Sequence, residues 1–101
     1  MIKTANFKYA VHFSKSFKKD YKRIKKQGKD ISKLKIIIEQ LANGEQLDPK
    51  YKNHYLTNYS EYKKAQECHV EPDWLLVYQY ANDELILLLI NTGSHSELFN
   101  K

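Results

Sequence analysis

Two stretches of helical periodicity, with strand-like segments before and after them, limit what this chain can fold into. In residues 14–28 the apolar side chains of Phe17, Tyr21 and Ile24 recur every three or four positions on an otherwise basic segment, which predicts an amphipathic helix. Residues 30–44 repeat the pattern and stop at an Asn-Gly pair. Two short helices joined by a few residues predict a helical hairpin, whose apolar side must be buried against a second layer.

The second layer is predicted from the segments that alternate or are rich in apolar residues. Residues 9–13 are typical of a first strand, and residues 64–70, 74–80 and 85–91 of three more, separated by turn signals. The last of these is apolar on both faces, as in a strand central in a sheet. Residues 47–60 hold proline, asparagine and scattered tyrosines and are predicted to form an ordered loop. The order β-α-α-β-β-β predicts an α+β fold, with the helical hairpin packed on a small, mostly antiparallel sheet.

Length and cysteine content restrict the domain count and the compartment. The chain has 101 residues, which fits one domain spanning residues 1–101. Its one cysteine, Cys68, cannot form an internal disulfide, and this suits the reducing cytoplasm. No apolar segment is long enough for a signal peptide or a membrane span, so we expect a cytoplasmic protein without membrane contact.

The charge is distributed unevenly along the chain. Residues 1–35 carry twelve lysines and arginines against two acidic residues, whereas the remainder carries five lysines against ten acidic residues. This polarity predicts a face for a polyanion or an acidic partner, and the alternative is a solvated, lysine-rich helix surface. The candidate contact residues belong to the first helix: Lys18, Lys22, Arg23, Lys25 and Lys26.

Side chains suited to acid–base chemistry lie in the predicted loop and at the predicted strand ends. His54 falls in the loop, His69 ends one strand, Asp73 lies in the following turn, and His95 comes just after the last strand. Small sheets display catalytic groups at such places, so these four converge if the loop folds over the end of the sheet. The last residues, 94–99, are expected to form a short tail.

Other chemical interpretations of these residues are weaker. Cys68 beside His69 resembles a nucleophile pair, but neighbours along a strand point to opposite faces. Three histidines and an aspartate could bind zinc, yet no pair has the close spacing of metal ligands, so no metal and no cofactor are predicted. Trp74 serves either as core or as a platform for a substrate, and the core role is favoured.

Three segments resemble a known family of proteins. They are "YKNHYL" at 51–56, "ECHVEPDWLLVYQY" at 67–80 and "NTGSHSELF" at 91–99, and the helical segment 13–47 is similar as well. They resemble the YafQ branch of RelE-like toxins, which are ribosome-dependent mRNA endonucleases (mRNA interferases) of bacterial toxin–antitoxin pairs. The resemblance implies a microbial-ribonuclease-like fold that works without a metal.

The resemblance also implies roles for particular residues. By position in the motifs, His54, His69, Asp73 and His95 correspond to the family's catalytic group. Phe99 matches a terminal phenylalanine that contacts RNA or orders the tail, and the remaining candidates for RNA contact or support of the site are Trp74, Lys52, Lys63 and Lys64. One departure is Gln66, where such toxins often carry an arginine; Lys63 or Lys64 nearby would substitute for it only as a point charge.

Cleavage of RNA without a metal uses the neighbouring 2′-hydroxyl as the nucleophile. Imidazole suits both proton transfers because its pKa lies near neutrality. We expect His95 to act as general acid and His69 to stabilise the phosphate. The base is either His54 or Asp73, and Asp73 is preferred only if burial raises its pKa.

The expected partners are mRNA, the ribosomal RNA that the basic helix would contact, and an acidic antitoxin, with operator DNA bound only through the antitoxin complex. Two other functions remain open. The Gln66 departure favours a catalytically weakened toxin-like module that binds its antitoxin and represses their operon. A general nucleic-acid-binding protein would instead bind naked RNA or DNA without cleavage on ribosomes.

Overall fold

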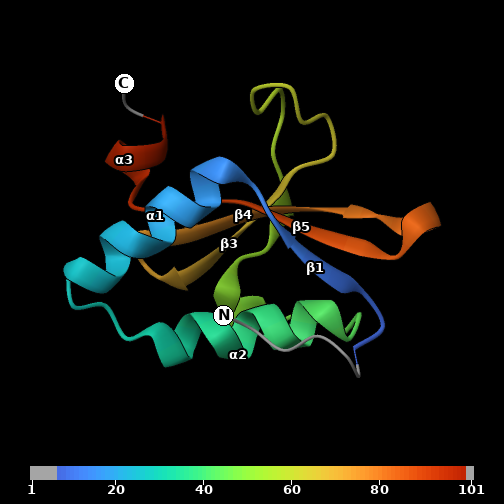
Figure 1. Cartoon of the computed structure of the whole chain (residues 1–101), viewed down its shortest axis with the longest axis horizontal. Helices are drawn as coiled ribbons and strands as arrows, with labels where there is room; N and C mark the ends of the chain where they lie inside the picture. The colour runs from blue at the N-terminus through green and yellow to red at the C-terminus, as the bar shows by residue number, and fades with distance from the viewer. Residues whose placement is uncertain (1–6, 100–101) are drawn as a thin grey trace.

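The computed structural model describes residues 7–99, so Lys3, part of the basic N-terminal third, lies outside the described residues. The described chain forms three α-helices, two short 3-10 helices and one five-stranded sheet (Figure 1). In chain order the elements are β1 (Ala10–Phe13), α1 (Lys15–Lys26), α2 (Ile31–Ala42), η1 (Pro49–Tyr51), β2 (His54–Tyr55), β3 (Gln66–Glu71), β4 (Trp74–Ala81), η2 (Asn82–Glu84), β5 (Ile86–Gly93) and α3 (His95–Phe99).

The strand order is β1-β5-β4-β3-β2. β1 runs parallel to β5, and the other neighbouring strands are antiparallel. The predicted α+β fold with a mostly antiparallel sheet is therefore confirmed. β5 is paired on both edges, which explains why its residues are apolar on both faces.

The two helices begin at the expected capping residues. The Ser14 hydroxyl accepts a hydrogen bond from the backbone N–H of Phe17 at 2.9 Å, and the Asp30 carboxylate accepts one from Ser32 at 3.1 Å. Between the helices Gly28 has a φ of +80°, a left-handed conformation that costs glycine little. The chain thereby reverses over four residues, and the predicted hairpin forms (Figure 1).

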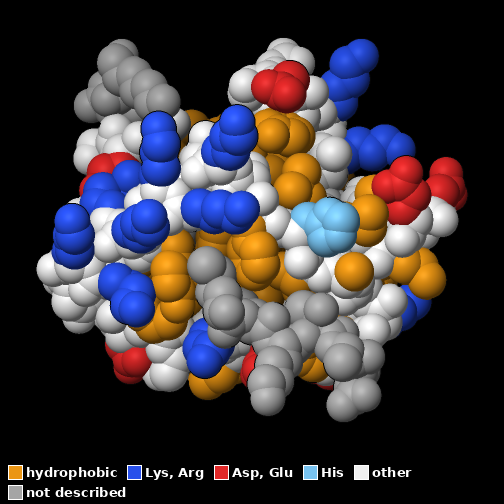
Figure 2. Space-filling view, in the orientation of Figure 1, with side chains coloured by type: hydrophobic (Ala, Val, Ile, Leu, Met, Phe, Trp, Pro, Cys, Tyr) orange, Lys and Arg blue, Asp and Glu red, His pale blue; other side chains and the backbone are white. Residues whose placement is uncertain are grey.

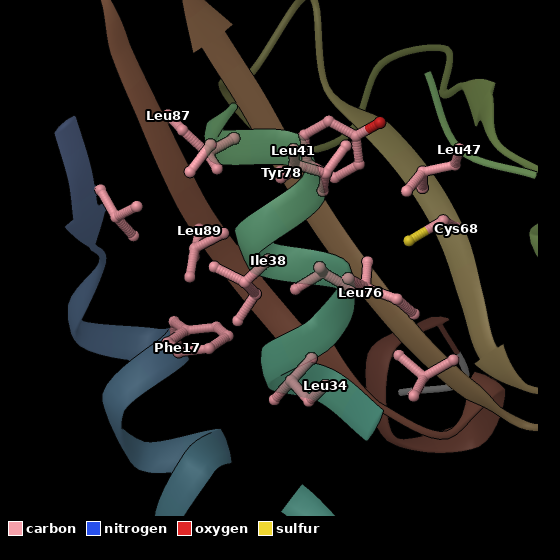
Figure 3. Close-up of a cluster of buried hydrophobic side chains, with 14 of the residues drawn as sticks. Phe17, Leu34, Ile38, Leu41, Leu47, Cys68, Leu76, Tyr78, Leu87 and Leu89 are labelled. Carbon is pink, nitrogen blue, oxygen red and sulfur yellow. The ribbon is translucent and has the colours of Figure 1, made fainter. Parts of the chain in front are cut away.

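The two faces of the sheet are covered by different segments. On one face, apolar side chains of α1 and α2, among them Phe17 and Ile38, pack on Leu76 and Leu89 in the main core (Figure 3). On the other face a smaller cluster joins Val77 and Ile90 to Leu98 of α3 and to Leu56, Tyr59 and Tyr62. Consistent with this, α3 and the segment between β2 and β3 lie on the side of the strands away from α2 (Figure 1).

Two predictions about local structure were wrong. The segment 47–60 is not entirely loop, because it contains η1 and the short strand β2, which pairs with β3 through His54 and Tyr55. The tail forms the helix α3, whose first turn is capped from within the tail itself. In both places long-range or capping hydrogen bonds, rather than local propensity, determine the backbone conformation.

The surface of α1 is basic. Lysine and arginine side chains gather over this helix on the face in Figure 2, and Lys18, Lys22, Lys25 and Lys26 are all exposed. Among the described helices, none combines the length and the apolar character that crossing a membrane requires.

Candidate active site

His95 and Asp73 form the closest contact among the predicted site residues. His95 begins α3, and Asp73 lies in the turn between β3 and β4. Asp73 Oδ1 accepts hydrogen bonds from the backbone N–H of His95 at 2.9 Å and from its ring Nδ1 at 2.7 Å. An ionised carboxylate can only accept, so Nδ1 carries the proton, and Nε2 is left to exchange a proton with a substrate.

The same hydrogen bonds determine the charge state of Asp73. The pKa of this carboxyl lies below its ordinary value, because the backbone N–H and the ring of His95 both donate to it. The side chain is 69% exposed, and the raising effect of burial on its pKa is outweighed by the hydrogen bonds from His95. The sequence favours Asp73 as the base only if burial raises its pKa. The pKa is lowered instead, so this condition is not met.

Ring contacts link α3 to β3 and to the segment between β2 and β3. The ring centroids of His69 and His95 lie 5.7 Å apart, and those of His95 and Phe99 lie 6.4 Å apart. Phe99 in turn packs edge-on against Tyr59 at 5.6 Å. The predicted approach of His69 and His95 is therefore present, with Phe99 beside them.

A buried carboxylate joins the other two histidines. Glu67 is only 5% exposed, and its Oε1 lies 3.5 Å from Nε2 of His54 and 3.5 Å from Nε2 of His69. Glu67 and His69 are two residues apart on β3 and share a face, and β2 places His54 directly opposite Glu67. The four predicted residues and Glu67 thus form one chain of acid–base groups across β2, β3 and α3.

The tautomer of His54 follows from its backbone contact. His54 Nδ1 lies 2.9 Å from the carbonyl oxygen of Lys52. A carbonyl oxygen only accepts, so Nδ1 donates, and in the neutral ring the lone pair is on Nε2. That lone pair makes His54 a suitable proton acceptor.

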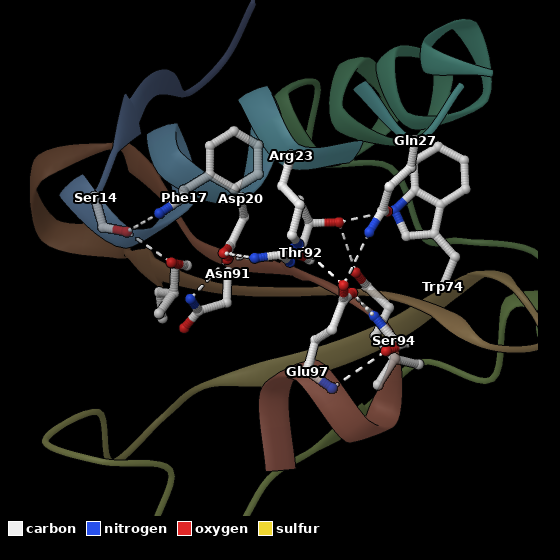
Figure 4. A network of polar contacts seen from close by, with 12 residues as sticks. Ser14, Phe17, Asp20, Arg23, Gln27, Trp74, Asn91, Thr92, Ser94 and Glu97 are labelled. Atoms are coloured by element: carbon white, nitrogen blue, oxygen red, sulfur yellow. Dashed lines mark hydrogen bonds and ion pairs between the residues drawn. The ribbon is translucent and has the colours of Figure 1, made fainter. Parts of the chain in front are cut away.

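The helix that carries His95 is held by a polar network (Figure 4). Ser94 and Glu97 cap each other: the backbone N–H of Ser94 donates to Glu97 Oε1 at 2.8 Å, and that of Glu97 donates to the Ser94 hydroxyl at 3.2 Å. Glu97 Oε2 accepts a hydrogen bond from Gln27 Nε2 at 3.0 Å and lies 3.1 Å from Arg23 Nε. The pKa of Glu97 is lowered, chiefly by the Ser94 N–H and also by the donor Gln27 and the charge of Arg23.

The network continues to a buried carboxylate in α1. Asp20, 7% exposed, accepts hydrogen bonds from Arg23 Nη1 at 2.9 Å, Asn91 Nδ2 at 2.8 Å and the Thr92 N–H at 3.0 Å. The Thr92 hydroxyl accepts a hydrogen bond from the indole of Trp74 at 2.9 Å. Trp74, next to Asp73, is fully buried, so it supports the site from the core and cannot contact RNA.

Several other sequence predictions are changed by these positions. Arg23 belongs to the network beneath α3 rather than to the freely exposed basic face of α1. Lys63 and Lys64 are exposed but precede β3, and Lys64 is five residues, about 16 Å of extended chain, before His69. Lys52 does lie at the site, through its carbonyl contact with His54.

Gln66 does not face the candidate site. Its side-chain oxygen accepts hydrogen bonds from Asn53 Nδ2 at 2.9 Å and from the Tyr78 hydroxyl at 3.2 Å, and Tyr78 belongs to the main core. Residues three apart on a strand point to opposite faces, so Gln66 and His69 lie on different sides of the sheet. The glutamine therefore leaves the face that carries Glu67 and His69 unaltered.

Sequence reasoning missed Glu67 and the residues that anchor α3. Strand alternation signals Glu67, because it places this residue on the face of His69. The spacing Ser94-x-x-Glu97 is that of a capping box and signals a helix at His95. No local pattern signals the partnership of Asp20 and Arg23 with β5 and α3, since it joins residues about 70 positions apart.

Neither a cysteine nucleophile nor a cluster of three metal ligands is found among the described residues. Cys68 is buried, and burial, with a smaller contribution from Glu67, raises the pKa of its thiol to about 12, so it is not a ready nucleophile. Among residues 7–99, no three His, Cys, Asp or Glu side chains are arranged to hold a metal ion.

The fold is that of bacterial toxins from type II toxin–antitoxin systems. The YafQ family of these toxins matches residues 9–100, and the chain belongs to this family. The mRNA interferase toxin YafQ of Escherichia coli BL21-DE3 is 38% identical over 90 residues, which are 88% of this chain and 94% of the relative. A putative toxin YafQ of Haemophilus influenzae is 32% identical over 95 residues, covering 87% and 91% of the two chains.

Solved structures of similar proteins have the same fold. A metal-bound toxin from Helicobacter pylori is 44% identical and superposes with a TM-score of 0.83, covering 90% of this chain and 99% of that chain. The Escherichia coli DinJ–YafQ complex contains a chain that is 37% identical, with a TM-score of 0.80 and coverage of 90% and 98%. The family expected from the sequence motifs is thus confirmed.

Proposed function

We propose that this chain is an mRNA interferase, an endoribonuclease that cuts mRNA on the ribosome by attack of the 2′-hydroxyl on the neighbouring phosphate. Two Escherichia coli relatives, 38% and 36% identical, are mRNA interferase toxins. The observation that carries the proposal is the chain of groups from His54 through Glu67 and His69 to His95 and Asp73. These groups include candidates for a general acid and for a general base, the two proton-transfer groups that the reaction needs.

His95 is the general acid. Asp73 accepts the hydrogen bond from Nδ1–H of His95, which leaves Nε2 as the ring nitrogen available to a substrate. The proton on Nε2 passes to the 5′-oxygen as the P–O bond breaks. Asp73 remains ionised throughout, as its lowered pKa requires.

His54 is the general base. Its Nδ1 is occupied by the Lys52 carbonyl, so Nε2 takes the proton from the 2′-hydroxyl. This choice follows from the failure of the condition for Asp73. The oxygen freed of its proton attacks phosphorus and forms a 2′,3′-cyclic phosphate, while the 5′-hydroxyl product departs with the proton from His95.

His69 stabilises the phosphate between these two groups. It is partly buried, its Nε2 approaches Glu67, and its ring lies beside that of His95. The Glu67 carboxylate, placed behind both His54 and His69, fixes their rings and balances the positive charge they carry when protonated. Phe99 offers an exposed ring beside His95 for contact with a base.

The cytoplasmic partners follow from charge and from the relatives. The exposed lysines of α1 bind ribosomal RNA, and an acidic antitoxin competes for the same surface; the Escherichia coli relative occurs in a complex with DinJ. Operator DNA is bound only through the antitoxin complex. The observation that favoured a weakened module, Gln66, no longer does so because that residue faces away from the site.

The experiment is toe-print mapping of one message on translating ribosomes, with the wild-type protein and with His95→Ala. Wild-type protein is expected to produce new ends within codons, and the variant to produce none at equal folding and concentration. The assay is repeated after exhaustive chelation of transition metals with Mg²⁺ restored, and cleavage should persist. Equal cutting by both proteins would refute the catalytic assignment, and zinc-dependent recovery after chelation would refute the metal-independent mechanism.

A further inference from the structure

A cleft of about 430 Å³ lies between α2, η1 and the end of β3, and the mechanism above does not use it. His69 is one of its lining residues, so the cleft lies along the edge of the strand that carries this histidine. Its volume is in the range of small-ligand sites, which begin near 300 Å³.

The cleft follows an unpaired edge of the sheet. β2 pairs with β3 only through His54 opposite Glu67 and Tyr55 opposite Gln66. Beyond Glu67, the outer edge of β3 has no strand partner among the described residues, and η1 and α2 stand there instead. An extended strand of RNA leaving the histidines can therefore turn into the cleft without meeting another element of the sheet.

The charge of the cleft favours an anion. Three lysines line it, Lys33, Lys50 and Lys52, against one carboxylate, that of Glu71. Lys33 Nζ lies 2.8 Å from Glu71 Oε2, and this pair neutralises itself. Lys50 and Lys52 form no ion pair within residues 7–99 and leave an excess of positive charge beside His69.

The floor of the cleft is flat and apolar. The ring of Tyr51 is partly buried, with Lys50 Nζ 5.2 Å from its centroid. Ile37 and Val70 are buried beneath it, and Ile36 is 52% exposed at its rim. An aromatic ring with adjacent lysines is the combination that holds an unstacked base and its phosphate in single-stranded nucleic acid.

We propose that this cleft is an RNA subsite, which receives one unpaired nucleotide adjacent to the cut. The base stacks on Tyr51 and contacts Ile36, and the phosphate is bound by Lys50 and Lys52. This inference rests on the proposed function, and it names the part of the site that selects among messages. An antitoxin segment is the rival occupant, and the ring of Tyr51 beside the lysines favours RNA, whose bases can stack on it.

Binding is measured apart from cleavage, using the full chain and a fluorescein-labelled RNA hexamer of mixed sequence. All its 2′-hydroxyls are methylated, so the nucleophile is absent and the probe stays intact. Tyr51→Ala and the double variant Lys50→Gln, Lys52→Gln should each weaken binding about tenfold, the scale of one lost base stack. Tyr55→Ala and Lys35→Gln are matched controls, exposed and outside the cleft, and should bind as wild type does.

The second measurement is the distribution of cut sites on translated message. Tyr51→Leu keeps an apolar side chain but no ring, so it tests stacking even where alanine destabilises the fold. It should redistribute the cut sites, whereas Tyr55→Ala should leave them unchanged. Unchanged hexamer binding and unchanged cut sites would overturn the subsite.

Antitoxin affinity separates the two occupants. Loss of antitoxin binding in the cleft variants, with hexamer binding intact, would assign the cleft to the antitoxin and refute the RNA subsite. If the wild-type protein binds the hexamer through the cleft but never cuts message on ribosomes, the proposed function fails while the subsite stands.

Discussion

The two ends of the candidate site are built in different ways. At one end, His95 lies on a five-residue helix that is tied to α1 through Glu97, Arg23 and Asp20. At the other end, His54 lies on a two-residue strand, held by pairing with β3, by the Lys52 carbonyl and by the approach of Glu67.

The difference shows what each group needs. A helix of one turn is not stable alone, so the position of His95 depends on contacts with residues far away in the chain. His54 is positioned locally by an edge strand and a neighbouring carbonyl. Substitutions that disrupt α1 should therefore displace His95 more than His54.

The largest effect on stability is expected for Asp20→Asn. The amide has one acceptor oxygen instead of two and places a donor among three existing donors, so the buried network loses its charge and part of its hydrogen bonding. We expect the free energy of unfolding to fall by about 2–4 kcal/mol, measured by urea denaturation. Asp83→Asn in exposed η2 is the control and should change little, and equal behaviour of the two variants would contradict the role of Asp20.

The next effect concerns the base end. Glu67→Gln keeps the shape but removes the charge between His54 and His69, so both rings lose their orienting partner. Single-turnover cleavage should fall by up to about 100-fold, with a smaller effect on unfolding. Glu61→Gln, an exposed carboxylate between β2 and β3, is the matched control. Full activity of Glu67→Gln would reduce Glu67 to a structural residue.

A smaller, pH-dependent effect on the free energy of unfolding is expected from Glu97 in α3. The folded-state pKa of Glu97 lies below its ordinary value near 4.5, so the ionised form is the one that stabilises the fold. Its contribution, about 1 kcal/mol, is complete above pH 4.5 and is lost as pH falls through the lowered pKa. The difference in unfolding free energy between wild type and Glu97→Gln should therefore be present at pH 7 and vanish at acid pH. A difference that grows on acidification would contradict the sign.

The smallest effect per residue is expected from the basic face of α1. Changing Lys18, Lys22 and Lys25 to Gln should weaken ribosome association and flatten its salt dependence, without altering the cleavage step once bound. The triple variant of Lys35, Lys63 and Lys64 has the same change in net charge and serves as the control. If both variants lose the same affinity, only net charge matters and α1 is not a specific contact surface.

Much of the fold could be predicted because its signals are local. The stripe of Phe17 and Ile24, the cap at Asp30 and the apolar segment before Gly93 each determine an element from neighbouring residues. β2 could not be predicted, since only its pairing with β3 makes two residues a strand. α3 has a local signal in the capping-box spacing of Ser94 and Glu97.

The residues of the candidate site could be predicted from the sequence, but the contacts between them could not. Motif position gave His54, His69, Asp73 and His95, and the structure brings them together. Whether Asp73 is buried, which face Gln66 takes and what lies between His54 and His69 depend on the sheet register and on distant partners. For this reason the sequence left the base open between His54 and Asp73.

The central claim is that His95 donates the proton to the departing oxygen and that His54 removes one from the 2′-hydroxyl. The most direct measurement is single-turnover cleavage on programmed ribosomes of message with sulphur in place of the 5′-bridging oxygen at the cut site. A thiolate leaves with little need of a proton, so the acid becomes dispensable while the base does not.

His95→Ala should be impaired by about 10²–10⁴-fold on normal message and nearly restored on the sulphur message. His54→Ala should stay impaired on both. Rescue of the His54 variant instead would exchange the two roles, and rescue of neither would show that His95 is not the general acid.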